Sequence, residues 1–151
     1  MYARDDMLKA IKHYQKLYSR FSERVRNHYS VSQTEFDVVA FLNNHPQNNT
    51  AKEICEIRML TKSNVSVAVE NLSRMGFLVC KTDEQDRRIV RLDFLPKADD
   101  LRKEIELVQE EFTNALFQGI SQEEAHQLFL TLSRINQNAV NKMEEMKHAG
   151  Q

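Results

Sequence analysis

The residues best suited to bind a charged ligand lie in a short polar turn, Asp83–Arg88, which ends in two adjacent arginines. An apolar stretch at 77–80 precedes this turn, and an alternating stretch at 89–94 follows it. The pattern predicts a β-hairpin that presents guanidinium groups at its tip. Arginines at such a tip suit the minor groove of duplex DNA, where negative potential is concentrated. The alternative is an ordinary solvated turn. The elements next to the hairpin are needed to choose between these two interpretations.

Two helices are expected directly before the hairpin. Thr50 and Glu53 have the spacing of a capping box and open a short helix that ends near Arg58. After a tight turn at residues 59–60, Thr61 caps a second helix, 61–75, which stops before a glycine. Together they predict a helix-turn-helix, in which the N-terminal part of the second helix enters the major groove.

The second helix has an apolar face, which is expected to pack against the domain, and a polar face. The outward residues are Ser63, Val67, Glu70 and Arg74, with Lys62, Asn64 and Ser66 near its start. Hydroxyl and amide groups can bond to bases or phosphates, a lysine suits a phosphate, and an outward valine can contact thymine methyl groups. An amphipathic core helix fits the same periodicity, but it does not explain the arginine-tipped hairpin that follows.

The remaining chain is expected to be helical. Apolar residues recur at steps of three and four from about residue 5 to 28, and Ser32 begins a capping box for a helix that ends before Pro46. A long helix is expected from about residue 97 to 118, begun by Pro96, and Ser121 begins the capping box of a last helix. The predicted fold is mainly α with a small β-hairpin wing.

Composition narrows the function classes. The 151 residues carry a net charge of −1, with the excess of acid in residues 96–151, and Arg87, Arg88 and Arg91 form the densest basic cluster. Two cysteines form no disulfide framework or metal motif, and the polar N-terminus is unlike a signal peptide. We therefore expect a cytoplasmic protein with no membrane span, no cofactor and no metal.

The lack of common catalytic motifs argues against an enzyme. Three glycines cannot make a phosphate-binding loop, and neither a nucleophile-elbow sequence nor a zinc-protease motif occurs. The carboxylates are scattered in a way that is typical of solvated helix faces.

Residues 32–95 resemble the winged helix-turn-helix of the MarR family of transcription regulators. The segments that carry the resemblance are 60–66, 71–79 and 83–92. The last is the most specific, because Asp86 and Arg88 match the Asp-x-Arg of the family's wing. The chain departs from the family at Val67, where an arginine is common, and after residue 94, where the family commonly has Leu-Thr-x-x-Gly.

The resemblance implies roles for these residues. Arg88 would enter the minor groove, with Asp86 as its orienter, while Arg74 and Arg87 would contact phosphates. Residues 31–96 would be the DNA-binding domain, and residues 1–30 and 97–151 a helical dimerisation region. The chain would then be a homodimeric, sequence-specific regulator, a repressor by expectation, that binds a roughly palindromic operator in double-stranded DNA.

The resemblance also implies a small effector that lowers DNA affinity. Apolar candidates for its pocket are Tyr14, Tyr18, Phe21, Phe36 and Phe112. Arg20, Arg24 or His28 would be anion partners, although packing as ordinary core explains most of these aromatics better. Cys55 and Cys80 are redox candidates, Cys80 being the better one because Lys81 follows it, and inert packing is the alternative.

The second function considered is a winged-helix protein-interaction module without specific DNA binding. The outward Val67, the acidic Glu70 and the mild net charge favour it. Salt dependence separates the two functions, because displacement of counterions makes DNA binding weaken steeply with salt.

Overall fold

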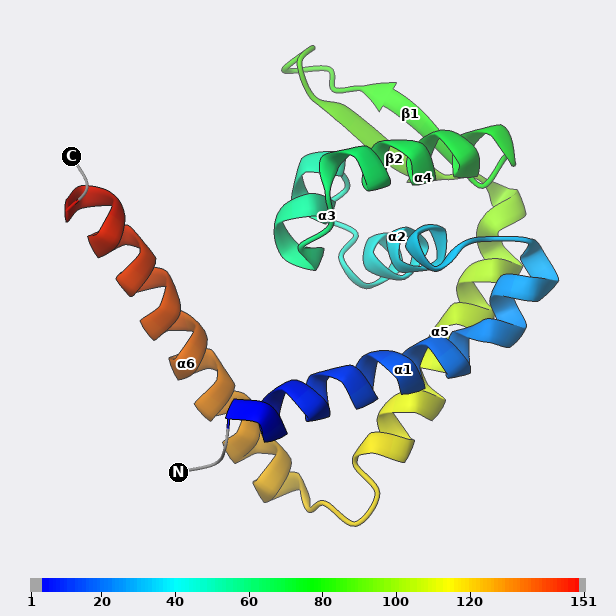
Figure 1. Ribbon diagram of the computed structural model, residues 1–151. Coiled ribbons are helices and arrows are strands. Elements are labelled where there is room, and N and C mark those ends of the chain that lie inside the picture. Colours follow the sequence, from blue (N-terminus) through cyan, green and yellow to red (C-terminus); the bar gives the residue numbers. More distant parts are fainter. Residues whose placement is uncertain (1–3, 150–151) are drawn as a thin grey trace. The chain divides into compact units, whose positions relative to one another are not determined.

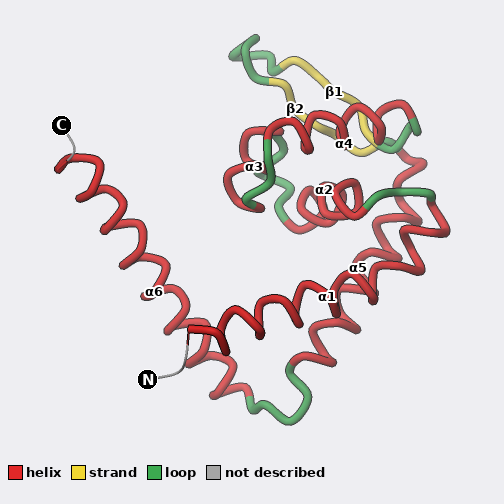
Figure 2. Tube along the Cα trace, in the orientation of Figure 1, coloured by secondary structure: helices red, strands yellow, loops and turns green. Residues whose placement is uncertain are grey.

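The chain is mainly helical, with one two-stranded antiparallel sheet, in a computed structural model that describes residues 4–149 (Figures 1 and 2). The predicted fold class is therefore confirmed. The elements follow one another in the order α1 (Arg4–Tyr29), α2 (Gln33–Asn44), α3 (Ala51–Arg58), α4 (Lys62–Arg74), β1 (Leu78–Thr82), β2 (Val90–Phe94), a 3₁₀ turn (Pro96–Ala98), α5 (Asp99–Leu116) and α6 (Gln122–Ala149).

Side-chain caps begin the helices where the sequence predicts them. The Ser32 and Thr50 side chains each accept a hydrogen bond from the backbone N–H three residues later, and the glutamate there bonds back to the cap. The same reciprocal pair joins Ser121 and Glu124 before α6. Each box satisfies backbone N–H groups that have no partner within the helix.

Two residues with positive φ set the path through the winged helix. Met59 ends α3 in the left-handed conformation, with φ of 53°, and makes the tight turn into α4. Gly76 follows α4 with φ of 78°, a conformation that costs glycine no steric penalty. The Phe77 N–H then donates to the Leu72 carbonyl oxygen, and the chain turns into β1.

The hairpin and the helix after it differ slightly from the prediction. The strands pair from Leu78 with Phe94 to Thr82 with Val90, so Phe77 and Ile89 lie just outside the ladder. Pro96 begins a 3₁₀ turn, and α5 begins only at Asp99. This later start of α5 has a local explanation, because proline suits a first helical turn and short 3₁₀ segments often begin α-helices.

The chain divides into two compact units, Met1–Phe112 and Thr113–Gln151. Buried apolar side chains of the first unit form its core, and they include Phe36, Phe41, Ile54, Leu72, Leu78, Leu101 and Ile105. This core joins the helix-turn-helix, the base of the hairpin, the second half of α1 and most of α5. The predicted division into DNA-binding and dimerisation regions concerns function and stays a prediction.

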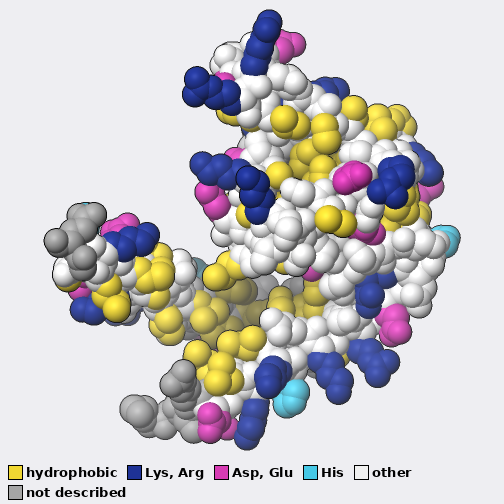
Figure 3. Space-filling view, turned by 45° about the horizontal axis from the view of Figure 1, so that its top comes forward, with side chains coloured by type: hydrophobic (Ala, Val, Ile, Leu, Met, Phe, Trp, Pro, Cys, Tyr) yellow, Lys and Arg dark blue, Asp and Glu magenta, His cyan; other side chains and the backbone are white. Residues whose placement is uncertain are grey.

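The second unit contains the end of α5 and all of α6. None of the α6 residues that the structure describes is buried. Figure 3 shows apolar side chains exposed along this helix, and the largest are Leu128, Phe129, Leu130, Leu132, Ile135, Met143 and Met146. In the described part of the chain, no helix is both long and apolar enough to span a membrane.

Candidate nucleic-acid interface

Helix α4 presents one polar face to solvent and packs the other into the core. Val65, Ala68 and Leu72 are buried, whereas Val67 keeps 57% of its surface exposed. The outward residues predicted for DNA contact are all exposed, and they are Lys62, Ser63, Asn64, Ser66, Val67 and Arg74. All of the residues that α4 was predicted to offer to DNA are therefore open to solvent.

The start of α4 is suited to an anion. Thr61 caps the helix by accepting a hydrogen bond from the Asn64 N–H at 3.3 Å. The first turn contains no acidic residue. The positive end of the helix dipole therefore lacks a carboxylate of its own there, and together with Lys62 it favours a phosphate group.

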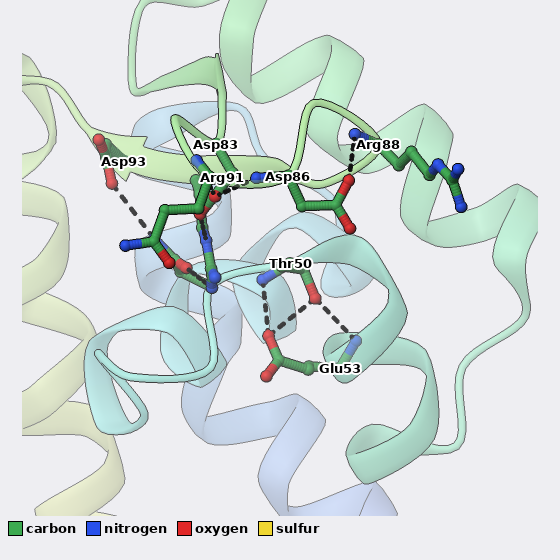
Figure 4. Close-up of polar contacts among 9 residues, drawn as sticks. Thr50, Glu53, Asp83, Asp86, Arg88, Arg91 and Asp93 are labelled. Carbon is green, nitrogen blue, oxygen red and sulfur yellow. Dashed lines mark hydrogen bonds and ion pairs between the residues drawn. The ribbon is translucent and has the colours of Figure 1, made fainter.

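The tip of the hairpin is a structured turn. The Asp83 Oδ1 accepts hydrogen bonds from the N–H groups of Gln85 at 2.9 Å and Asp86 at 3.0 Å. The Asp86 Oδ1 accepts one from the backbone N–H of Arg88 at 3.0 Å. Asp86 thus contacts the backbone of Arg88 and shapes the turn, while the guanidinium group points away from it (Figure 4).

Arg91 does not form an exposed basic cluster with Arg87 and Arg88. Its Nε donates to the Asp83 Oδ2 at 3.0 Å and its Nη1 to the Asn49 Oδ1 at 3.1 Å (Figure 4). Its positive charge is therefore largely compensated. By contrast, no acidic side chain in residues 4–149 forms an ion pair with Arg87 or Arg88.

The Arg91 contacts attach the hairpin to the helix-turn-helix. Asn49 lies just before the Thr50 cap of α3, and its carbonyl oxygen accepts the N–H of Leu92 at 2.8 Å. Its Nδ2 donates to Asp93, which also pairs with Lys81 at 2.9 Å. The loop before α3 is thereby joined to three successive residues of β2, Arg91, Leu92 and Asp93, and these contacts anchor the base of the hairpin.

The surroundings of Asp83 keep its carboxylate charged, as its bond to Arg91 requires. The N–H of Asp86, the guanidinium group of Arg91 and the N–H of Gln85 all lower its pKa, because each stabilises the charged form. Sequence reasoning missed Asp83, Arg91 and Asn49 as positioning residues. The hairpin spacing could have suggested the first pair, but nothing local links Asn49 to a residue 42 positions later.

Comparisons with known proteins agree with this geometry. Residues 29–89 match the model of the MarR family. The winged helix of this chain is thus similar to that of the MarR family. No curated protein matches the sequence significantly.

Solved structures extend the likeness beyond the matched segment. The transcriptional regulator PA3341 has a TM-score of 0.79 at 24% identity, over 90% of this chain and 98% of its own. S. aureus MepR in its DNA-binding conformation has a TM-score of 0.77 at 19% identity, over 91% of this chain and 99% of its own. The S. aureus MepR–DNA complex has a TM-score of 0.74 at 17% identity, over 91% and 97%. The helices on both sides of the winged helix therefore share the fold of these proteins.

The five aromatic residues predicted to line an effector pocket do come together. The Phe112 ring lies in edge contact with Tyr14 and Tyr18, both with centroids 5.0 Å away, and with Phe21 at 5.8 Å. Phe36 packs against Tyr18 at 5.9 Å. Burial raises the pKa of the Tyr18 hydroxyl. The rings contact one another directly, as in a core, and their role toward an effector stays a prediction.

The two cysteines lie in different surroundings. Cys80 is exposed on β1, with its Sγ 3.8 Å from the Ser73 Oγ, and Cys55 is half-buried on α3. Both are free thiols. Lys81 is turned toward Asp93, so its ammonium charge is shared with a carboxylate.

Proposed function

We propose that this chain is a sequence-specific DNA-binding transcription regulator that works as a homodimer, a ligand-responsive repressor of the cytoplasm. One observation carries the proposal: the helix-turn-helix exposes a polar face of α4, and Arg91 joins the arginine-tipped hairpin to the loop that begins its first helix. The α4 face supplies groups for the major groove, and Arg88 supplies the probe for the adjacent minor groove. The likeness to MepR, which has been solved with DNA, supports the same function.

In this proposal the exposed face of α4 makes the contacts with the major groove. Ser63, Asn64 and Ser66 offer hydrogen-bonding groups, and the exposed Val67 offers methyl groups that match thymine. Arg87 and Lys62 serve phosphates, which position the protein without reading sequence.

A second copy of the chain is the expected partner. Helix α6 and the first half of α1 expose apolar side chains, including Leu132, Ile135, Leu8 and Ile11. Exposed apolar faces of this length mark association surfaces. Two copies related by a two-fold axis would present their α4 helices to successive major grooves, about 34 Å apart, and so require a roughly palindromic operator.

Effector response would act on the spacing between the two α4 helices. The aromatic cluster around Phe112 joins α1, α2 and α5, which connect the winged helix to the association surfaces. A ligand that separates these rings would shift α2 relative to α5. A small hinge movement then weakens both half-site contacts together.

Fluorescence anisotropy tests the proposal directly. The purified chain is titrated into duplexes from its own upstream region at two salt concentrations, and the sequences that it retains from a randomised duplex pool are determined. We expect tight binding that weakens steeply with salt, and loss of most of that affinity in Arg88→Ala. Lys103→Ala, which removes an exposed positive charge from α5, is the control and should bind as the wild type does.

The protein-interaction module remains the competing function, favoured by the exposed Val67 and by Glu70. It predicts weak DNA binding that neither salt nor Arg88→Ala changes, and no enriched sequence in the randomised pool. That combination of results would reject the regulator.

A further inference from the structure

A buried carboxylate lies beneath the polar face of α4. Glu35, in the first turn of α2, keeps only 6% of its surface exposed. Its Oε2 accepts the backbone N–H of Ser32 at 2.8 Å, which completes the capping box. Its Oε1 accepts a hydrogen bond from the Asn71 Nδ2, also at 2.8 Å. Both oxygens are therefore engaged, as a buried charge requires.

The carboxylate determines which way the Asn71 amide faces. An ionised carboxylate only accepts hydrogen bonds, so the amide must turn its NH₂ group toward Glu35. The amide oxygen is then directed to the other side. There it accepts a hydrogen bond from the Arg74 Nη2 at 2.8 Å. A chain of hydrogen bonds thus runs from the α2 cap, through Asn71, to an arginine on the surface of α4.

Arg74 lies on the α4 face that the proposed function assigns to DNA. Its side chain is 70% exposed, one helical turn beyond Glu70, which approaches it at 3.8 Å. The Asn71 bond occupies one of its five N–H donors, and the rest of the fork can serve a phosphate. A side chain that is already held loses less conformational freedom on binding.

We propose that Asn71 is a positioning residue: oriented by the buried Glu35, it holds the Arg74 guanidinium group in place for a phosphate of the DNA backbone. The inference rests on the proposed function and names a contact within the same interface. Neither Asn71 nor Glu35 touches DNA in this arrangement, and their effect passes through Arg74.

A double-mutant cycle measures that dependence in the full-length chain. Arg74→Ala, Asn71→Ala and the double variant are titrated into the operator duplex by anisotropy over a series of salt concentrations. Loss of one phosphate contact reduces the slope of log Kd against log salt by about one. We expect Arg74→Ala and Asn71→Ala each to give this reduction, and the double variant to give no further one. Ser73→Ala, on another side of the same helix, is the control and should keep the wild-type slope.

Stability is monitored separately, since Asn71→Ala leaves a buried carboxylate short of one donor. Circular dichroism melts of every variant report whether the fold is kept at the titration temperature. Glu35→Gln is the second variant, because glutamine still serves a capping box but does not force the Asn71 amide into one orientation. We expect it to reduce the slope in the same direction.

Three results would overturn the inference. If Asn71→Ala and Glu35→Gln both keep the wild-type slope while Arg74→Ala reduces it, Arg74 acts without the relay. Additive effects in the double variant have the same meaning. If the wild-type chain shows no salt-dependent binding to any duplex, the proposed function fails, and this inference fails with it.

Discussion

Helices α4 and α6 are both amphipathic, but α4 buries its apolar side chains and α6 leaves them exposed. In α4, Leu72 is completely buried, and the exposed face is mostly polar. In α6, Leu132 keeps 49% of its surface exposed, and no described residue of the helix is buried. The first helix is stabilised within its own chain, whereas the second keeps an apolar surface that a partner can cover. Periodicity alone does not separate these two cases.

The largest expected effect is in the core beneath α4. Leu72→Ala should lower the free energy of unfolding by about 2–5 kcal/mol, because it removes buried apolar surface and leaves a cavity. Leu132→Ala in α6, the matched substitution, should cost less than about 1 kcal/mol in dilute protein. Urea unfolding measures both. Equal costs at every protein concentration would contradict the contrast between the two helices.

A charge placed on the apolar face of α6 should break the proposed dimer. Ile135→Glu is expected to raise the dimer dissociation constant at least about tenfold, because the carboxylate would lose its water on association. Sedimentation measures the change. Gln137→Glu, on the opposite side of the same helix, is the control and should leave association unchanged. If Ile135→Glu also leaves it unchanged, the dimer does not form through this face.

Two of the three capping boxes, one in each compact unit, should give a smaller effect, and how far that effect spreads should differ between the units. Thr50→Ala and Ser121→Ala each remove a side-chain cap, which costs about 1 kcal/mol of helix stability. We expect Thr50→Ala to lower the unfolding midpoint of the whole winged helix, because α3 belongs to its core. Ser121→Ala should speed amide hydrogen exchange only near the start of α6. Global destabilisation by Ser121→Ala would show that α6 unfolds together with the core.

Acid should loosen the wing by protonating Asp83. Its pKa is lowered in the folded chain, so its contribution is present above the unfolded value of about 3.9 and is lost as the pH falls through the folded value. NMR of the hairpin amides should therefore change below about pH 4, and Asp83→Asn should show the loosened wing already at neutral pH. An unchanged hairpin in Asp83→Asn would show that Arg91 and Asn49 hold the wing without it.

Local chemistry explains why most of the elements were predictable. A capping box needs a hydroxyl and a glutamate three residues apart, and the predicted boxes at Ser32 and Thr50 both form. The hairpin was predictable from alternating residues around a polar turn. Its ends were less so, because pairing of Leu78 with Phe94 depends on the twist and register of both strands.

The candidate interface was predictable only in its outward residues. Helical spacing identified Ser63, Val67 and Arg74 as neighbours, but it could not show what holds them. Arg91 looked like one more basic residue near the tip, and Glu35 looked like a capping residue alone. Their further partners, Asn49 and Asn71, lie 42 and 36 positions away in the chain.

The sequence by itself determined the order of helices, their caps, the arginine-tipped turn and the resemblance to the MarR family. These features depend on residues within a few positions of one another, where backbone geometry limits the possible contacts. Only the tertiary structure decided that Arg91 braces the wing against the α3 loop and that Glu35 directs Asn71 toward Arg74. Such contacts form because core packing brings distant segments together and because buried polar groups must then find partners.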